Sequence, residues 1–102
     1  MTEKPTVSEV LFNAFGSDFS EATQRQRLLL LEAVAFSLRS GRSWRANLDS
    51  IRYDSRYDSP LPESIFIRAE ITTNEGLKLM AILNVAIVEG YSVLAASERL
   101  HT

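Results

Sequence analysis

The chain has no cysteine and only one histidine among its 102 residues. Without cysteine there is no disulfide framework, no thiolate metal site and no thiol nucleophile. The histidine, His101, stands beside the C-terminus, where chains fray, so it is a poor general base and cannot form a metal site alone. The four glycines stand apart and form no phosphate-binding loop. These shortages predict a protein that is not an enzyme and that needs no cofactor or metal.

Long apolar runs are also missing. The longest, residues 77–88, is interrupted by Lys78 and Asn84, whereas a membrane-spanning helix needs roughly 20 apolar residues. The first ten residues are polar and acidic, unlike a secretory signal. Absence of cysteine fits a reducing compartment. We therefore expect no membrane contact and a cytoplasmic location.

The residues that are present are those of an ordinary globular protein. Hydrophobic residues make up 45% and charged residues 24% of the chain, both close to globular averages. A length of 102 residues fits one domain, and a chain of this length can bury a core without a disulfide or a metal ion to stabilise it. We expect residues 1–102 to form a single helical interaction domain.

The spacing of apolar residues, together with residues that typically begin or end helices, predicts three helices in the first half of the chain. Residues 7–15 repeat apolar side chains at intervals of three and four, and Gly16 follows as a stop. Residues 21–40 are apolar on most of the helix circumference, with Ser20 as the expected N-cap and Gly41 as the stop. Ser43 is expected to cap a short helix over 44–51.

The sequence of the second half allows more than one prediction of its secondary structure. Residues 52–62 contain the tandem RYDSRYDS and two prolines, which favours a loop. Residues 74–88 favour a helix, with Gly90 as a break and Ser92 as the cap of a last helix. The predicted fold is mainly α, one compact domain of four to five helices. The alternative is a short β-hairpin around 64–83, because 65–71 alternate in polarity.

The charge distribution is uneven although the net charge is only −2. Residues 25–56 carry seven arginines against three acidic residues, and both ends of the chain are acidic. Arginine, tryptophan and tyrosine concentrate within this basic segment, and these residue types carry much of the binding energy at protein interfaces. The candidate partner-binding residues are Arg39, Arg42, Trp44, Arg45, Tyr53, Arg56 and Tyr57.

Two partner classes fit this arginine and aromatic segment. A protein partner with an acidic surface is favoured, and the chain would then be a small regulatory protein that binds and modulates its partner. Nucleic acid is the alternative, because arginine contacts phosphates and aromatic rings stack on bases. A third interpretation assigns Trp44 to the core and pairs the arginines with nearby aspartates.

Two predicted helices, 21–40 and 74–88, are apolar on more than one side. In a chain of 102 residues, this surplus exceeds what one core can cover, which predicts a homodimer. The alternative is a monomer in which both helices are central.

Near the C-terminus, Glu89, Gly90, Ala95, Ala96 and Leu100 resemble the opening of the winged helix-turn-helix in LysR-type regulators. In that family a Glu-Gly turn separates two helices that precede the recognition helix. The sequence ends at Thr102, where a recognition helix would begin, so no DNA-reading residue is carried over.

Overall fold

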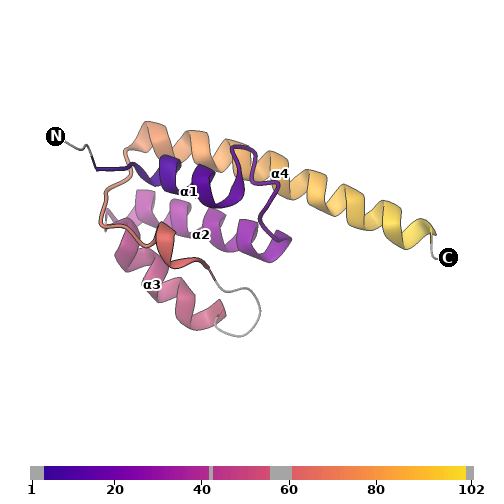
Figure 1. Ribbon diagram of the computed structural model, residues 1–102, viewed down its shortest axis with the longest axis horizontal. Helices are drawn as coiled ribbons and strands as arrows, with labels where there is room; N and C mark the ends of the chain where they lie inside the picture. The colour runs from indigo at the N-terminus through magenta and orange to yellow at the C-terminus, as the bar shows by residue number, and fades with distance from the viewer. Residues whose placement is uncertain (1–3, 42, 56–60, 101–102) are drawn as a thin grey trace.

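A computed structural model describes residues 4–41, 43–55 and 61–100. Within these ranges the protein has four α-helices and one turn of 3-10 helix. They are α1 (Val7–Phe15), α2 (Gln24–Ser40), α3 (Trp44–Ser55), η1 (Glu63–Ile65) and α4 (Thr73–Leu100) (Figure 1). The expectation of a mainly α fold is confirmed. No strand occurs in the described ranges, and the alternative hairpin over 64–83 was wrong because helix α4 takes up its second half.

The first two helices end at the predicted glycines. α1 begins after Thr6, whose hydroxyl accepts a hydrogen bond from the Glu9 amide, and it ends at Gly16. α2 ends at Gly41, which adopts the left-handed conformation with φ of 70°. The start of α2 differs from the prediction.

Helix α2 begins at Gln24 and is capped by Thr23, three residues after the predicted cap Ser20. Thr23 and Gln26 form a reciprocal capping box, in which each side chain accepts a hydrogen bond from the other residue's amide, at 3.1 and 2.9 Å. Ser20 instead lies in the loop, where its amide donates to the Asp18 carboxylate at 3.0 Å. The capping box satisfies two amides, which a lone serine cannot do.

Helix α3 starts as predicted and runs further than predicted. The Ser43 hydroxyl accepts a 3.3 Å hydrogen bond from the Ala46 amide at its N-terminus. The helix continues to Ser55, so the first copy of the tandem, residues 52–55, is helical and the predicted loop over these residues was wrong. The second copy begins at residue 56, and 56–60 lie outside the described residues.

Helix α4 is continuous from Thr73 to Leu100, so the predicted break at Gly90 and the cap at Ser92 were wrong. Ser92 lies within the helix, where its hydroxyl donates to the Val88 carbonyl at 3.1 Å. The Glu-Gly turn on which the LysR-type resemblance depended is therefore absent. At the other end, the Thr72 hydroxyl accepts from the Glu75 amide at 3.1 Å and caps the helix.

Helices α2 and α4 pack antiparallel, and two glycines of α4 mark the places of closest approach. A Cβ atom on Gly76 would lie 2.6 Å from Leu38 Cδ2, and a Cβ on Gly90 would lie 2.8 Å from Gln24 Cδ. Each pair of residues, on each helix, is 14 positions apart. Gln24 also donates to the Ile87 carbonyl at 2.7 Å. These glycines serve helix packing rather than chain reversal.

Residues of all four α-helices and of η1 form the core. Helices α2 and α4 cover it on one side, and α1, α3 and η1 cover its other sides (Figure 1). Its largest fully buried side chains come from every helix and from the loop after α1: Trp44, Phe19, Leu11, Leu30, Leu48, Ile65, Leu79, Leu83, Val7 and Val34. One buried polar contact joins α2 to α3, because the Asn47 amide donates to the Ser37 hydroxyl at 2.7 Å. That hydroxyl donates in turn to the Ala33 carbonyl.

The molecule is elongated, with principal extents of 55 × 25 × 25 Å. The length comes from α4, whose C-terminal part projects beyond the other helices (Figure 1). Over the part of the chain that the structure describes, every helix is too short or too polar to span a lipid bilayer.

Candidate interaction surfaces

Trp44, the expected aromatic anchor of the arginine segment, lies in the core. Its side chain is fully buried, and its indole Nε1 donates a 2.8 Å hydrogen bond to the Ile65 carbonyl. Its backbone amide donates to the Ala69 carbonyl at 3.0 Å. The ring therefore fastens α3 to the segment around η1 and presents no face to a partner. The interpretation of Trp44 as a core residue is the one that fits this structure.

Arg39 and Arg45 are exposed on the two sides of the turn between α2 and α3. The Arg39 guanidinium lies over the Phe36 ring, 4.9 Å from its centre. Arg45 Nε is 3.9 Å from Asp49, and both side chains are about half exposed at 48% and 49%. An ion pair of this length at the surface holds a side chain weakly. We call these two arginines the basic corner, and both remain accessible to an acidic group.

The other four predicted contact residues have no described side chain. Arg42, Arg56 and Tyr57 lie outside the described residues. Tyr53 belongs to α3, but its side chain also lies outside the described part. The structure therefore shows Arg39 and Arg45 exposed on either side of one turn and leaves the rest of the predicted surface as a prediction.

A second surface lies on α4 and was not predicted as a site. Its outward side, which we call the α4 face, consists of exposed residues at helical spacing: Leu77, Ala81, Asn84, Val85, Val88 and Tyr91. The large members are 55% (Leu77), 59% (Val85), 64% (Val88) and 53% (Tyr91) exposed. Elsewhere among the described side chains, the exposed large hydrophobic residue is Leu28 of α2.

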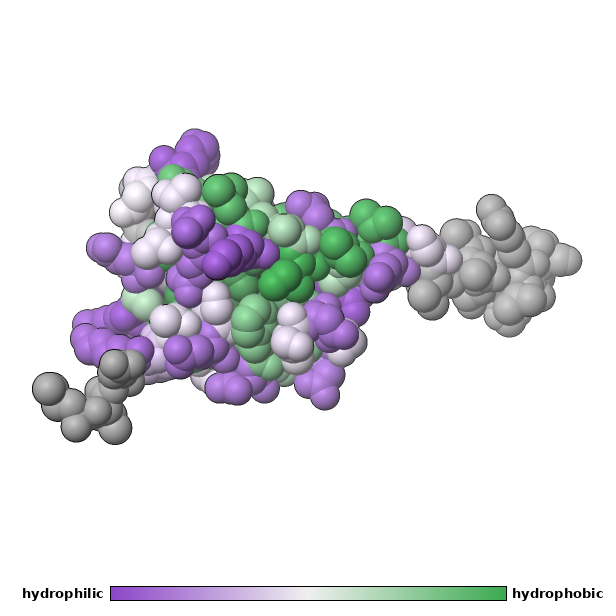
Figure 2. Space-filling model, turned by 90° about the horizontal axis from the view of Figure 1, so that it is seen from above, coloured by the Kyte–Doolittle hydropathy of each residue, from purple (hydrophilic) through white to green (hydrophobic). Residues whose placement is uncertain are grey.

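Figure 2 looks down on the side of the molecule where α4 lies. Hydrophobic residues gather in the middle of this view and toward the end from which α4 projects, with polar residues around them. An apolar side chain in contact with water loses the free energy that burial would give, about 25 cal/mol per Å². Grouped exposure of this kind marks a contact surface more often than isolated exposed residues do.

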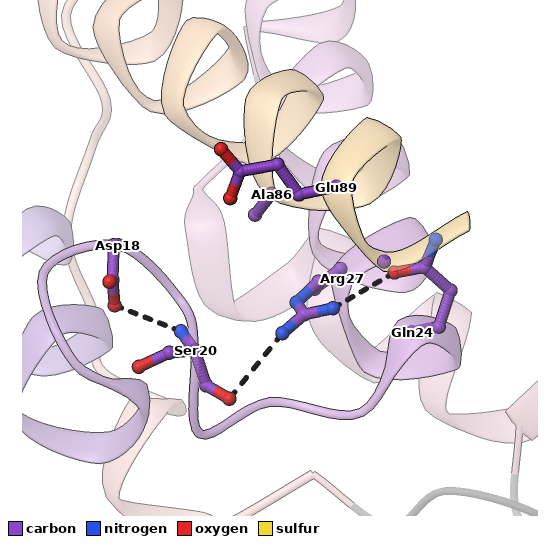
Figure 3. Close-up of a pocket in the computed structure, with 7 residues that line it drawn as sticks. Asp18, Ser20, Gln24, Arg27, Ala86 and Glu89 are labelled. Carbon is purple, nitrogen blue, oxygen red and sulfur yellow. Dashed lines mark hydrogen bonds between the residues drawn. The ribbon is translucent and has the colours of Figure 1, made fainter. Parts of the chain in front are cut away.

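A groove of about 390 Å³ lies where α2, α4 and the loop after α1 meet. Asp18 and Ser20 line it from the loop, Gln24 and Arg27 from α2, and Glu89 from α4 (Figure 3). Hydrogen bonds from the Ser20 side chain and amide lower the pKa of Asp18 and keep its carboxylate charged.

Arg27 uses its guanidinium to hold the groove together. It donates to the Phe19 carbonyl at 2.9 Å, to the Ser20 carbonyl at 3.4 Å and to Gln24 Oε1 at 3.0 Å. Phe19 needs this support, because it has a left-handed backbone with φ of 59° and a fully buried ring. The groove therefore contains a structural arginine, three of whose five N–H donors already have partners in the protein.

The described residues include no group of three or more histidine, cysteine, aspartate or glutamate side chains placed to hold a metal ion. Comparison of the chain with protein families, with curated proteins and with solved structures finds no match. The α4 face and the basic corner are the two surfaces of the described residues that indicate a function.

Proposed function

We propose that the chain is a non-catalytic interaction domain that binds and modulates a protein partner from a cytoplasmic location. The observation that supports this proposal best is the α4 face. Four large hydrophobic side chains on one helix, each more than half exposed, suit contact with another apolar protein surface, such as a helix laid along them. Such a surface has no charged group to bind a phosphate and few polar groups to bind a small polar substrate.

The basic corner supplies a second contact surface in this proposal. Arg39 and Arg45 are exposed and lie close in the sequence to Arg42, Arg56 and the two tyrosines of the predicted site. Exposed arginines recognise carboxylates through paired hydrogen bonds, which favours an acidic protein partner. The formal net charge of −2 disfavours nonspecific attraction to nucleic acid.

Nucleic-acid binding through the basic corner is the second candidate, supported by the same two exposed arginines. The candidates differ in their dependence on salt. Contacts to phosphates release counterions and weaken steeply as salt rises, whereas apolar contacts do not.

A capture experiment with the tagged full chain tests the proposed function. Native lysate is divided into nuclease-treated and untreated halves, and the bait is the wild type, the double variant Arg39→Ala/Arg45→Ala, or Val88→Glu. We expect a protein that survives nuclease treatment and is lost with one of the two variants. Leu28→Glu is the matched control, because Leu28 is an exposed apolar residue of α2 outside both surfaces, 40% exposed.

Loss of the captured protein in the arginine variant assigns it to the basic corner, and loss in Val88→Glu assigns it to the α4 face. Capture that collapses on nuclease treatment supports nucleic-acid binding instead. Capture of nothing beyond what an empty tag retains contradicts both candidates.

A further inference from the structure

The α4 face has the spacing of a helix-pairing surface. Five of its six residues follow one another at intervals of four, three, four and three, namely Leu77, Ala81, Asn84, Val88 and Tyr91, and Val85 lies beside them. This alternation keeps one side of a helix against a neighbouring helix over several turns. Residues 77–91 provide roughly 21 Å of such a surface, at 1.5 Å per residue.

The α4 face is also self-complementary about its midpoint. Leu77 and Tyr91 each lie seven residues from Asn84, and Ala81 and Val88 lie on either side at three and four residues. Two copies related by a two-fold axis near Asn84 would therefore oppose large residues with large ones at both ends. The small Ala81 side chain allows the helices to approach closely opposite Val88.

The charges beside the α4 face fit an antiparallel pair and disfavour a parallel one. Lys78 and Glu89 are 11 residues apart, so they lie on the same flank of the helix, within about 20° of each other at 100° per residue. Both lie on α4. About a two-fold axis near Asn84, Lys78 of each copy faces Glu89 of the other. In a parallel pair this flank would lie on opposite sides of the two copies, so Lys78 and Glu89 would meet no opposite charge across the interface.

We infer that the α4 face binds a second copy of this chain in an antiparallel arrangement, with Asn84 of both copies at the two-fold axis. The inference rests on the proposed function, because it names the occupant of one of the two contact surfaces. An asparagine amide has both donors and an acceptor, so two such amides can pair across the axis and fix the register.

The projecting end of α4 adds length to the contact in this arrangement. A stable interface buries roughly 800 Å² on each partner, which is more than a helix pair of about 21 Å supplies. In the antiparallel arrangement the part of each α4 that extends past its own body (Figure 1) lies along the body of the other copy. The basic corner, on the turn between α2 and α3, lies outside the α4 face.

Cysteine cross-linking tests the arrangement directly, because the chain has no cysteine of its own. We expect Asn84→Cys to form a disulfide-linked dimer with itself under mild oxidation. Leu77→Cys and Tyr91→Cys should each fail to cross-link alone and should cross-link to one another when mixed. A disulfide needs Cα atoms within about 7 Å, whereas the two Leu77 positions would be several times farther apart.

Leu28→Cys, on α2, is the matched control and should remain uncrosslinked. Self-cross-linking of Leu77→Cys and of Tyr91→Cys would show a parallel pair and overturn the inference. Absence of any cross-link from all three α4 positions would also overturn it.

Sedimentation velocity supplies a second measurement that needs no oxidation. We expect a wild-type dimer at micromolar concentration and at least tenfold weaker association for Lys78→Glu and for Glu89→Lys. The double variant Lys78→Glu/Glu89→Lys should recover most of the loss. Val88→Glu should be a monomer with an unchanged far-UV circular dichroism spectrum, because Val88 is an exposed residue.

A wild-type monomer at high micromolar concentration would overturn the inference. If capture from lysate still depends on Val88, the proposed function survives and the α4 face belongs to a different protein. A dimer that captures nothing would contradict partner binding at the basic corner while it upholds the inference.

Discussion

At the scale of single residues, the four glycines fall into two groups with opposite roles. Gly16 and Gly41 have positive φ angles of 86° and 70° and end helices. Gly76 and Gly90 lie inside α4, where side chains of α2 leave no room for a Cβ atom. Sequence alone does not separate the groups, because a glycine beside an apolar run is equally consistent with a helix end and with a close helix contact. The break predicted at Gly90 was wrong for this reason.

Replacing Gly90 with alanine tests the close approach of α2 and α4. Helix propensity alone predicts stabilisation by about 1 kcal/mol. The new Cβ would lie 2.9 Å from Arg27 Nη1 and 2.8 Å from Gln24 Cδ, and overpacking costs about 1–3 kcal/mol. Gln24 cannot move without weakening its hydrogen bond to Ile87. We therefore expect Gly90→Ala to lower the free energy of unfolding, measured by urea denaturation.

Ser92→Ala is the matched control for that substitution. Ser92 lies in the same helix and is exposed, so its replacement should leave stability unchanged or raise it slightly. If Gly90→Ala raises the free energy of unfolding as much as Ser92→Ala does, the result would contradict the close approach of α2 to α4 at Gly90.

Trp44 illustrates a second limit of prediction from residue type. Tryptophan is common in binding surfaces and also common in cores, so its position in an arginine-rich segment favoured a surface role. The hydrogen bond from its indole to the Ile65 carbonyl joins residues 21 positions apart. No local pattern in the sequence reports such a contact. The exposure of Arg39 and Arg45, by contrast, follows from their charge and was predictable.

At the scale of helices, ends that are fixed by local hydrogen bonds were predicted well. Gly16, Gly41 and Ser43 each lie where the local signal placed them. The start of α2 was misplaced by three residues, because Ser20 and Thr23 are both acceptable N-caps. Thr23 is the N-cap because Gln26, three residues later, completes a capping box with it.

Substitution of the two competing cap residues distinguishes the two starting points of α2. We expect Thr23→Ala to lower the free energy of unfolding by about 1 kcal/mol, the usual cost of losing an N-cap. Ser20→Ala should cost less, because Ser20 lies in the exposed loop and caps no helix. Thermal or urea unfolding followed by circular dichroism measures both. A larger loss for Ser20→Ala would contradict the observed start of α2.

At the scale of the whole molecule, the surplus of apolar residues was predicted but its location was not. Leu77, Val85 and Val88 are aliphatic residues, as are the buried Leu79 and Leu83 of the same helix. Which side of α4 is covered depends on where α2 packs, and the close contacts at Gly76 and Gly90 decide that. The α4 face could therefore be found only with the fold in hand.

A dimer held by the α4 face should make the thermal stability depend on protein concentration. Association of folded chains shifts the folding equilibrium by mass action. We expect the melting temperature of the wild type to rise as its concentration is increased a hundredfold, and that of Val88→Glu to stay constant. Differential scanning calorimetry measures both, and equal behaviour of the two proteins would argue against the dimer.

The matched spacing of Gly76 and Gly90 against Leu38 and Gln24 also limits how the protein can move. If α4 slid along α2 by one helical turn, about 5.4 Å, toward its own N-terminus, both glycines would leave their contacts at once. Residues 80 and 94, a methionine and a leucine, would take their places. Switching proteins often use such a ratchet between packed helices. Here the two close contacts oppose sliding of α4 along α2, so a displacement of its projecting end would reach the body as tilt or torsion rather than as movement along the helix axis.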